Sequence, residues 1–294
     1  NNMSTNFQCV QEDTMGKMIA FAGKGGVGKT TLCGLLIQYL CETGKKPILA
    51  VDADANSNLN TYGIQNMFQG FYYIYSKPEQ QWGYYAHYIR FMEDAAPGQP
   101  YLDLKEVLDG KEYFILTTNC DIQIPKVFPE DKVFQFQGDF RFFQCCQPCH
   151  DAIYDNHDMI TDMLLNMDGL EVPEERIPRC PYCGRRMIPW VQDNTFLQGD
   201  TWKSAYDRYE AFVQKWHKKK LLLLELGVGE MTPSVIKLPF WDMTVRFPET
   251  KLITVNMGKA ECPSHLQGKC VAIQADLAAC MCTLKKEMSN GEPI

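Results

Sequence analysis

The sequence predicts an α/β protein with a Rossmann-like parallel sheet, helices on both faces of that sheet, and a small inserted zinc-ribbon module. Short apolar strands alternate with helical segments along the 294 residues, several strands end in glycine or polar loops, and two cysteine pairs interrupt the alternation. We expect a flexible segment 1–16, a P-loop unit 17–60, a Rossmann-like domain formed by 61–140 and 188–285, a zinc-binding module 141–187, and a tail 286–294.

Composition excludes several classes of function. The net charge of −7 opposes binding to nucleic acid or to an anionic membrane, because both would repel the chain. The basic run WHKKK, residues 216–220, is interpreted as a solvated turn. No apolar run approaches the ~20 residues that span a bilayer, and the first residues lack the pattern of a secretory signal. We therefore expect a cytoplasmic protein.

The thirteen cysteines are expected to be metal ligands or packing residues, since a reducing cytosol disfavours structural disulfides. Those in apolar or helical contexts are interpreted as packing residues. They are Cys33, Cys41, Cys120, Cys270 and Cys280.

The first strand and helix enclose a phosphate-binding loop. The segment KMIAFAGKGGVGKTTLCGLLIQYL contains G-x-x-x-x-G-K-T between a predicted strand and a predicted helix, so that backbone N–H groups surround a polyphosphate at the helix N-terminus. Lys29 is expected to neutralise phosphates and Thr30 to hold Mg²⁺, which makes ATP with Mg²⁺ a candidate ligand. The loop comprises Gly23, Lys24, Gly25, Gly26, Gly28, Lys29, Thr30 and Thr31.

With the additional lysine Lys24, this loop resembles the deviant Walker A ATPases, and the following VDADANSNLN is similar to the carbon monoxide dehydrogenase maturation factors. The resemblance covers residues 17–60. It implies that Lys24 reaches the nucleotide of a dimer partner and that Asp54 lies near the attacking water or the metal. The second carboxylate that such ATPases need has one candidate, Glu225 in LLLLELGVG, where Glu replaces the usual Asp and the spacing to glycine differs.

The next segments predict core and a ligand-binding strand end. The aromatic stretch after Tyr62 is interpreted as core and cleft lining, because no basic residues interleave with the rings as in a base-stacking surface. PYLDLKEVL predicts a helix. EYFILTTNCDIQ predicts a strand that ends in Thr118, Asn119 and Asp121, and ligands of open α/β sheets bind at such strand ends.

Two cysteine pairs predict a structural Zn²⁺ site. FQCCQPCHD supplies Cys145 and Cys149, or Cys146 and Cys149 in the alternative register, and PRCPYCGRR supplies Cys180 and Cys183. Tetrahedral thiolate coordination clamps two turns that have almost no core of their own. Four thiolates leave no open position for water, so we expect the metal not to be catalytic.

Two later strands have the pattern of dinucleotide-contacting edges. KKLLLLELGVGEMTPSVI predicts an apolar strand, a loop of Gly227, Val228 and Gly229, and a helix opened by Thr232 and Pro233. ETKLITVNMGK predicts a strand that ends in Asn256. Glycines permit close backbone approach, and an Asn at a strand end can bond a ribose hydroxyl.

In this order, TTNCD, FQFQGDF, the paired cysteines, ELGVG and ITVN resemble the sirtuins, and residues 62–285 are similar to their macrodomain-linked microbial class of protein ADP-ribosyltransferases. The resemblance implies NAD as cofactor, bound by the Rossmann-like domain. Asn119 and Asp121 would lie beside the nicotinamide and its ribose, with Gly227–Gly229 at the ribose and phosphates. Asn256 would bind the adenosine ribose, with Asp276 and Leu277 of the QADL segment beside the adenine.

Gln137 occupies the position at which deacetylating sirtuins have a histidine. An amide cannot titrate near neutral pH, so it cannot act as the general base of that histidine. The change argues against deacetylation and for transfer of ADP-ribose to an acceptor protein. In such relatives the acceptor is a lipoyl-carrier protein of the glycine cleavage type, as implied by the resemblance.

The two resemblances meet near residues 60–62, as in a chimera. A natural fusion, an engineered chimera and a misassembled sequence all explain the join. The P-loop unit could occupy the place of the sirtuins' own first strand, glycine loop and helix, at a cost in NAD affinity, because a triphosphate loop wraps more tightly than a dinucleotide site. Two alternative functions remain: an ATPase or metallochaperone that uses Lys24, Lys29 and Thr30, and an inactive nucleotide-binding module.

Overall fold

The computed structural model describes residues 70, 73–229 and 232–289. The chain divides into two compact units, Asn1–Tyr84 with Asp168–Glu171, and Tyr85–Met167 with Val172–Ile294. The predicted P-loop unit, residues 17–60, lies outside the described residues. No helix among the residues described is long and apolar enough to cross a membrane.

The described part of the first unit centres on the start of α3 (Pro78–Asp94). Trp82 is buried, and the Tyr75 and Tyr84 rings lie 5.9 Å apart between centroids. Glu171 accepts hydrogen bonds from Lys77 and from Gln80. In the second unit the same helix continues with buried Tyr85, Ala86, Ile89 and Met92. The predicted core role is confirmed for these residues, whereas Ile74 earlier in the stretch is 92% exposed.

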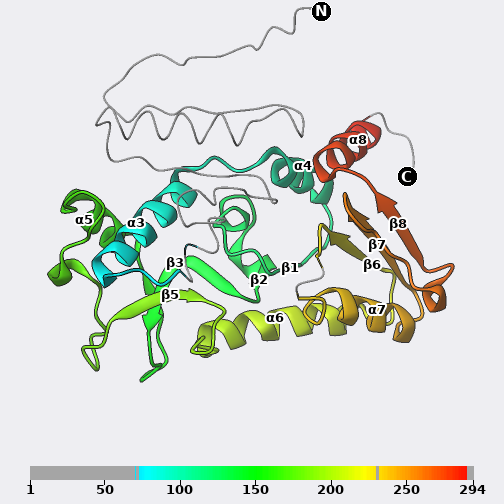
Figure 1. Cartoon of the computed structure of the whole chain (residues 1–294). Helices are drawn as coiled ribbons and strands as arrows, with labels where there is room; N and C mark the ends of the chain where they lie inside the picture. Colours follow the sequence, from blue (N-terminus) through cyan, green and yellow to red (C-terminus); the bar gives the residue numbers. More distant parts are fainter. Residues whose placement is uncertain (1–69, 71–72, 230–231, 290–294) are drawn as a thin grey trace, which may run out of the picture. The chain divides into compact units, whose positions relative to one another are not determined.

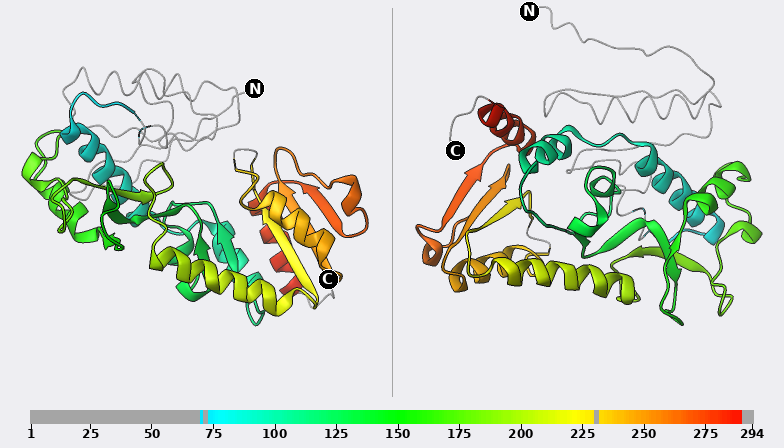
Figure 2. Two further views of the ribbon diagram at one scale, coloured as in Figure 1. Left: turned by 90° about the horizontal axis from the view of Figure 1, so that it is seen from below. Right: turned by 180° about the vertical axis from the view of Figure 1, so that it is seen from behind.

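The second unit contains a parallel three-stranded sheet in the order β6 (Leu221–Leu226), β7 (Thr250–Asn256) and β8 (Cys270–Gln274). Figures 1 and 2 show these strands side by side. Leu221 pairs with Thr250, and Leu252 pairs with Cys270. The helix α7 (Lys237–Arg246) packs against β6 and β7, where Leu223, Met243, Leu252 and Leu266 form a buried cluster.

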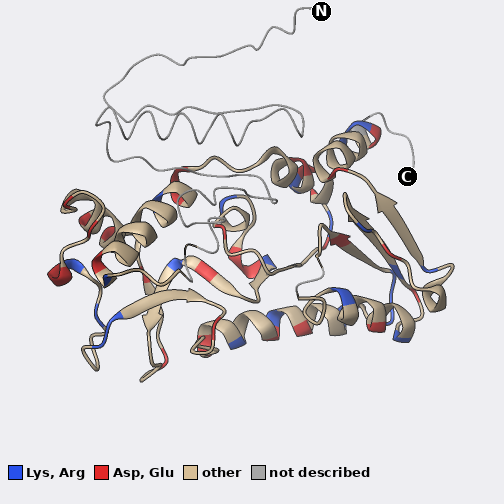
Figure 3. Cartoon of the chain, in the orientation of Figure 1, with Lys and Arg blue, Asp and Glu red and all other residues tan. Residues whose placement is uncertain are grey.

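A second parallel pair joins β1 (Ile115–Thr117) to β2 (Val133–Gln135). Two short 3₁₀ helices, η2 (Ile124–Lys126) and η3 (Glu130–Lys132), lie between these strands in the chain. The long helix α6 (Asp200–Trp216) packs against β2. Figure 3 shows basic and acidic residues interspersed along α6, a mixed surface rather than a basic track.

The third sheet is antiparallel, in the order β4 (Tyr154–Asp155), β3 (Gly138–Cys145) and β5 (Met187–Val191). It carries the cysteine pairs together with α5 (His157–Leu165) and η4 (Glu174–Arg176). Elsewhere in this unit, α4 (Gln99–Leu108) packs against α8 (Leu277–Ser289), and η5 (Ser264–Leu266) precedes β8. The predicted α/β class with parallel strands is confirmed.

Of two local predictions, one was confirmed and one was wrong about where a helix begins. The basic residues after Trp216 form an exposed turn before β6, as predicted. The helix predicted to open at Thr232 and Pro233 begins instead at Lys237. Val235 N–H donates to the Thr232 carbonyl and Leu238 N–H to the Pro233 carbonyl, so this segment first forms turns.

Cys270 packs against the Leu223–Met243–Leu252–Leu266 cluster, as predicted, but it is not a free packing residue. Cys270 is disulfide-bonded to Cys262 across a separation of 8 residues. The segment after β7 returns to the first residue of β8, and the two Cα atoms lie 5.8 Å apart, within the range that a disulfide spans. The expectation of reduced cysteines, based on a cytosolic setting, therefore fails at this pair.

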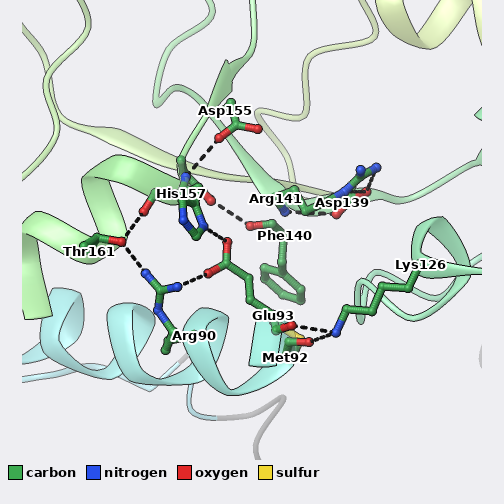
Figure 4. A network of polar contacts seen from close by, with 11 residues as sticks. Arg90, Met92, Glu93, Lys126, Asp139, Phe140, Arg141, Asp155, His157 and Thr161 are labelled. Carbon is green, nitrogen blue, oxygen red and sulfur yellow. Dashed lines mark hydrogen bonds and ion pairs between the residues drawn. The ribbon is translucent and has the colours of Figure 1, made fainter. Parts of the chain in front are cut away.

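A polar network anchors the end of α3 to the elements around it (Figure 4). The Lys126 ammonium donates to the carbonyls of Met92 and Glu93, at 2.6 and 2.8 Å, and to that of Ala95. The Glu93 carboxylate pairs with Arg90 at 3.1 Å and with His157 at 3.3 Å. Because η2 directly follows the predicted site segment 118–123, the network fixes that segment on α3.

Candidate nucleotide and metal sites

The segment after β1 brings two predicted site residues to the end of a parallel strand. Asn119 is exposed, its backbone N–H donates to Thr117 Oγ1 at 3.0 Å, and its side-chain Nδ2 donates to the Tyr101 hydroxyl at 3.1 Å. Thr118, which lies between Thr117 and Asn119 in the chain, is half-buried. The amide of Asn119 is thus oriented by α4 and remains accessible to a ligand.

Asp121 lies in a site that favours the protonated carboxyl. Burial raises the pKa of Asp121 above its ordinary 3.8, the nearby Asp139 carboxylate adds to this rise, and the backbone N–H of Gln123 opposes it. The next residue, Ile122, has φ +63°, a conformation that is strained for a β-branched residue. Strain of this kind is common at functional sites.

Gln137 lies in the turn between β2 and β3, beside this segment. Its carbonyl oxygen accepts from Gln192 N–H at 2.9 Å and from Cys120 Sγ at 3.4 Å. Gly138 permits the turn, because a Cβ there would lie 2.1 Å from the Trp190 carbonyl oxygen. The structure therefore brings the TTNCD and FQFQGD segments into contact.

Two further groups around Asp121 are held neutral. Burial raises the pKa of the Cys120 thiol to about 12, with the Asp139 and Asp121 charges adding to the shift. Burial also raises the pKa of Tyr88 to about 12. Neither group is therefore ionised near neutral pH, and Cys120 is not a nucleophile in this setting.

The second group of predicted residues lies at the carboxyl ends of β6, β7 and β8. Gly227 has φ +64°, and a Cβ there would lie 3.0 Å from Leu277. Asn256 Nδ2 donates to the Val228 carbonyl at 3.0 Å, while its Oδ1 accepts from Gly258 N–H at 2.8 Å. Asn256 thus ties the glycine loop to β7.

Gly229 and Asp276 complete this edge. A Cβ at Gly229 would meet no heavy atom within 4 Å, so close packing against the described residues does not require this glycine. Asp276 Oδ1 accepts from Ala279 N–H at 2.9 Å, which is the N-cap interaction that begins α8. The two groups of predicted residues are linked by α4, which positions Asn119 through Tyr101 and packs against α8.

Cys145, Cys149, Cys180 and Cys183 form one cluster, with all four sulfur atoms within 4.8 Å of one another. Cys145 and Cys183 are 3.6 Å apart between sulfurs, as are Cys149 and Cys180. Four ligands at ~2.3 Å in a tetrahedron place sulfurs ~3.8 Å apart, so the cluster fits Zn²⁺. Cys145, not Cys146, completes the set.

The pKa values of two thiols in this cluster shift in opposite directions. The backbone N–H of Arg185 is the main cause that lowers the pKa of Cys183 to about 6. Desolvation and the neighbouring thiols raise the pKa of Cys149 to about 12. Four thiolates this close together need a cation among them, as a structural metal provides.

Sequence reasoning missed several residues that build these sites. Tyr101, Tyr88 and Asp139 surround the Asn119–Asp121 segment, and His150 Nδ1 lies 3.1 Å from Cys149 Sγ. No local pattern identifies Tyr101 or Tyr88, because helix packing brings them there. The adjacency of His150 to Cys149 was the one available signal.

The predicted P-loop residues Gly23–Thr31 and Asp54 lie outside the described residues. Glu225, the candidate second carboxylate, is 3% exposed within β6, and its Oε1 accepts a hydrogen bond from Thr254 Oγ1 at 2.9 Å. It lies in the sheet rather than in the loop after the strand.

Comparisons with known proteins agree with both parts of the sequence. The model of the CbiA family, the CobQ/CobB/MinD/ParA nucleotide binding domain, matches residues 18–281. A protein ADP-ribosyltransferase of Staphylococcus aureus (strain Mu50 / ATCC 700699) is 30% identical over 242 residues, which cover 79% of this chain and 75% of that protein. The chain belongs to the CbiA family and to the family of this transferase.

A second relative and two solved structures extend the family comparison. A probable bifunctional ADP-ribose hydrolase/ADP-ribosyltransferase of Fusarium oxysporum f. sp. cubense is 26% identical over 212 residues, which cover 67% of this chain and 35% of that protein. A Sir2 homologue in complex with NAD has TM-score 0.52 at 15% identity, covering 86% of each chain. A Sir2 homologue mutant in complex with ADP-ribose has TM-score 0.53 at 17% identity, covering 73% of this chain and 76% of that one.

These likenesses establish a Sir2-like Rossmann fold for the chain. The CbiA match also extends across residues 60–62, where the sequence predicted a join between two resemblances. The cysteine cluster is a possible metal site.

Proposed function

We propose that the protein is a sirtuin-type, NAD-dependent protein ADP-ribosyltransferase. The observation that supports this most strongly is the contact between the Asn119–Asp121 segment and the Gln137 turn, through Cys120 Sγ and the Gln137 carbonyl at 3.4 Å. This contact supports the proposal because it joins the Asn119 amide, the Asp121 carboxyl with its raised pKa and a residue unable to titrate near one strand end. The family relationship to an ADP-ribosyltransferase supports the same reaction.

In this proposal the bond that breaks joins nicotinamide to its ribose, and its electron pair leaves with nicotinamide. Asn119, held by Tyr101, orients the nicotinamide ribose. Asp121 takes the proton of the acceptor side chain as that side chain bonds to the ribose. A carboxyl whose pKa is raised by burial is a better base than an ordinary one.

Gln137 favours transfer over deacetylation in the same proposal. Its backbone is fixed by Gln192 and Cys120. Its side-chain amide does not titrate near neutral pH and cannot act as a general base. Deacetylation needs a base at this position, whereas transfer to an external acceptor does not. We propose a protein acceptor, with a lipoyl-carrier protein as the first to test.

Release of nicotinamide from NAD tests the roles of these residues. We expect Asn119→Ala to lower the rate at least ~100-fold, as loss of an orienting group does. Gln137→Ala serves as the comparison and should lower it less than ~10-fold, because no proton transfer passes through it. Equal losses in both variants would contradict the assignment of roles.

A second candidate function rests on the CbiA match, which includes the P-loop. In that candidate Lys24, Lys29, Thr30 and Asp54 bind ATP with Mg²⁺. Parallel thermal-shift titrations of the whole chain with NAD and with Mg-ATP separate the two. Stabilisation by Mg-ATP that is lost in Lys29→Ala supports the ATPase, whereas stabilisation by NAD that is lost in Asn119→Ala supports the transferase.

A further inference from the structure

The second unit contains a cavity of about 240 Å³ that neither proposed function uses. The first two turns of α6 form one wall, and β2, η3, β3 and β5 contribute the others. None of the residues assigned to NAD or Zn²⁺ lines it. Its walls are rich in aromatic rings, which are supplied by Phe128, Phe134, Phe142, Trp190 and Trp202.

Two donors in this cavity lack a partner. Gln135 Nε2 and Arg208 Nε are both buried and form no hydrogen bond with any described residue. The indole N–H groups of Trp190 and Trp202 are instead satisfied by the Leu197 and Phe136 carbonyls, each at 2.9 Å. Buried donors are normally paired, so the two free ones indicate a missing acceptor.

The charges around the cavity favour an anion as that acceptor. Arg141 in the wall is already compensated by the buried Asp139 carboxylate, with Nε to Oδ2 at 2.7 Å. No described carboxylate pairs with Arg208. Glu130 also lines the cavity but is exposed to solvent. Thr201 and Trp202 lie in the first turn of α6, but this helix end does not add to the preference, because its Asp200 N–H already donates to the Asp151 carboxylate at 3.0 Å.

We propose that this cavity binds a small carboxylate with a flat apolar body. The carboxylate would accept from Arg208 and Gln135, and the ring would lie against the tryptophan and phenylalanine faces. The volume is below the ~300 Å³ at which ligand pockets commonly begin, so the body is about one aromatic ring. Benzoate is the simplest probe with this chemistry.

Ligand-observed NMR and thermal shift with benzoate, on the zinc-loaded full chain, test the proposal. We expect saturable binding with Kd on the order of 1 mM, typical of so few atoms. Arg208→Gln should weaken it at least ~5-fold, about 1 kcal/mol. Lys203→Gln is the matched control, since Lys203 is exposed on the same helix and is not among the lining residues. It should leave Kd unchanged.

Two further arms make the result decisive. Benzamide, which has the same ring without the charge, should bind at least ~5-fold more weakly than benzoate. Ala205→Trp, which fills the cavity from α6, should abolish binding while circular dichroism and zinc content stay at parent values. Equal affinity for benzamide, unchanged binding in Arg208→Gln, or no saturable binding by the parent chain would overturn the proposal.

Discussion

At the residue scale, the site consists of groups whose protonation is set by burial. Asp121 has a raised pKa, and the Cys120 thiol and the Tyr88 hydroxyl stay neutral. The sequence could indicate Asn119 and Asp121 because polar residues end a strand there, and Gln137 only through the resemblance to the sirtuins. It could not indicate that Ile122 adopts φ +63°, since an Ile in that conformation runs against its intrinsic preference.

Asp121→Asn should stabilise the protein near neutral pH while lowering nicotinamide release at least ~100-fold. A raised carboxyl pKa means that the folded state binds the proton more tightly than the unfolded state does. Ionised Asp121 therefore reduces stability as pH rises from its ordinary 3.8 through the raised folded-state value.

Melting temperatures of parent and Asp121→Asn from pH 3 to pH 8 measure this effect. The excess Tm of the variant should be largest at the high end of the range and shrink toward the low end. Asp131→Asn, at an exposed position, is the control and should show no such trend. A variant less stable than the parent at pH 8 would contradict the burial argument.

At the element scale, the zinc module and the disulfide loop differ in how well the sequence predicted them. The spacing of the cysteine pairs predicted a four-cysteine cluster, because metal ligands on turns leave a local pattern, but it left Cys145 and Cys146 as alternatives until the structure brought Cys145 into the cluster. No local sequence pattern predicts the Cys262–Cys270 bond, since this bond depends on how the chain returns to β8. The start of α7 was displaced for a similar reason, because turns within 232–238 replace its first turn.

Removing one zinc ligand should unfold the third sheet. In Cys180→Ser the three remaining thiols bind the metal more weakly, and the turns that carry the cysteines lose their clamp. We expect about one zinc per parent chain and a strong loss in the variant, with protease cleavage appearing within 141–187. Cys146→Ser is the matched control and should retain zinc, because Cys146 lies outside the cluster. Loss of zinc in Cys146→Ser as well would contradict the ligand set.

The disulfide should stabilise the second unit by reducing the conformational entropy of its unfolded chain. For a loop of 8 residues the entropy model gives about 2–3 kcal/mol. Cys262→Ser should lower the free energy of unfolding by about that amount under non-reducing conditions. Reductant should lower the parent to the level of the variant and leave the variant unchanged. An unaltered unfolding transition in Cys262→Ser would show that the bond contributes nothing.

At the scale of the whole molecule, the fold class was predictable because parallel strands, glycine loops and cysteine pairs each have a short-range pattern. The relation between segments was not, since Tyr101 and Asp139 act on groups that packing alone brings near them. The CbiA match and the transferase relative assign the same chain to nucleotide chemistry by two routes. The nucleotide that binds and the chemistry of the product distinguish these routes.

The most direct test incubates the protein with NAD labelled in its adenylate half and a lipoylated carrier protein. The account predicts a carrier whose mass rises by one ADP-ribose, one nicotinamide released per label transferred, and loss of both in Asn119→Ala. An acetylated peptide in place of the carrier should not be deacetylated. Nicotinamide release without label on any acceptor protein, or label transfer that persists in Asn119→Ala, would contradict it.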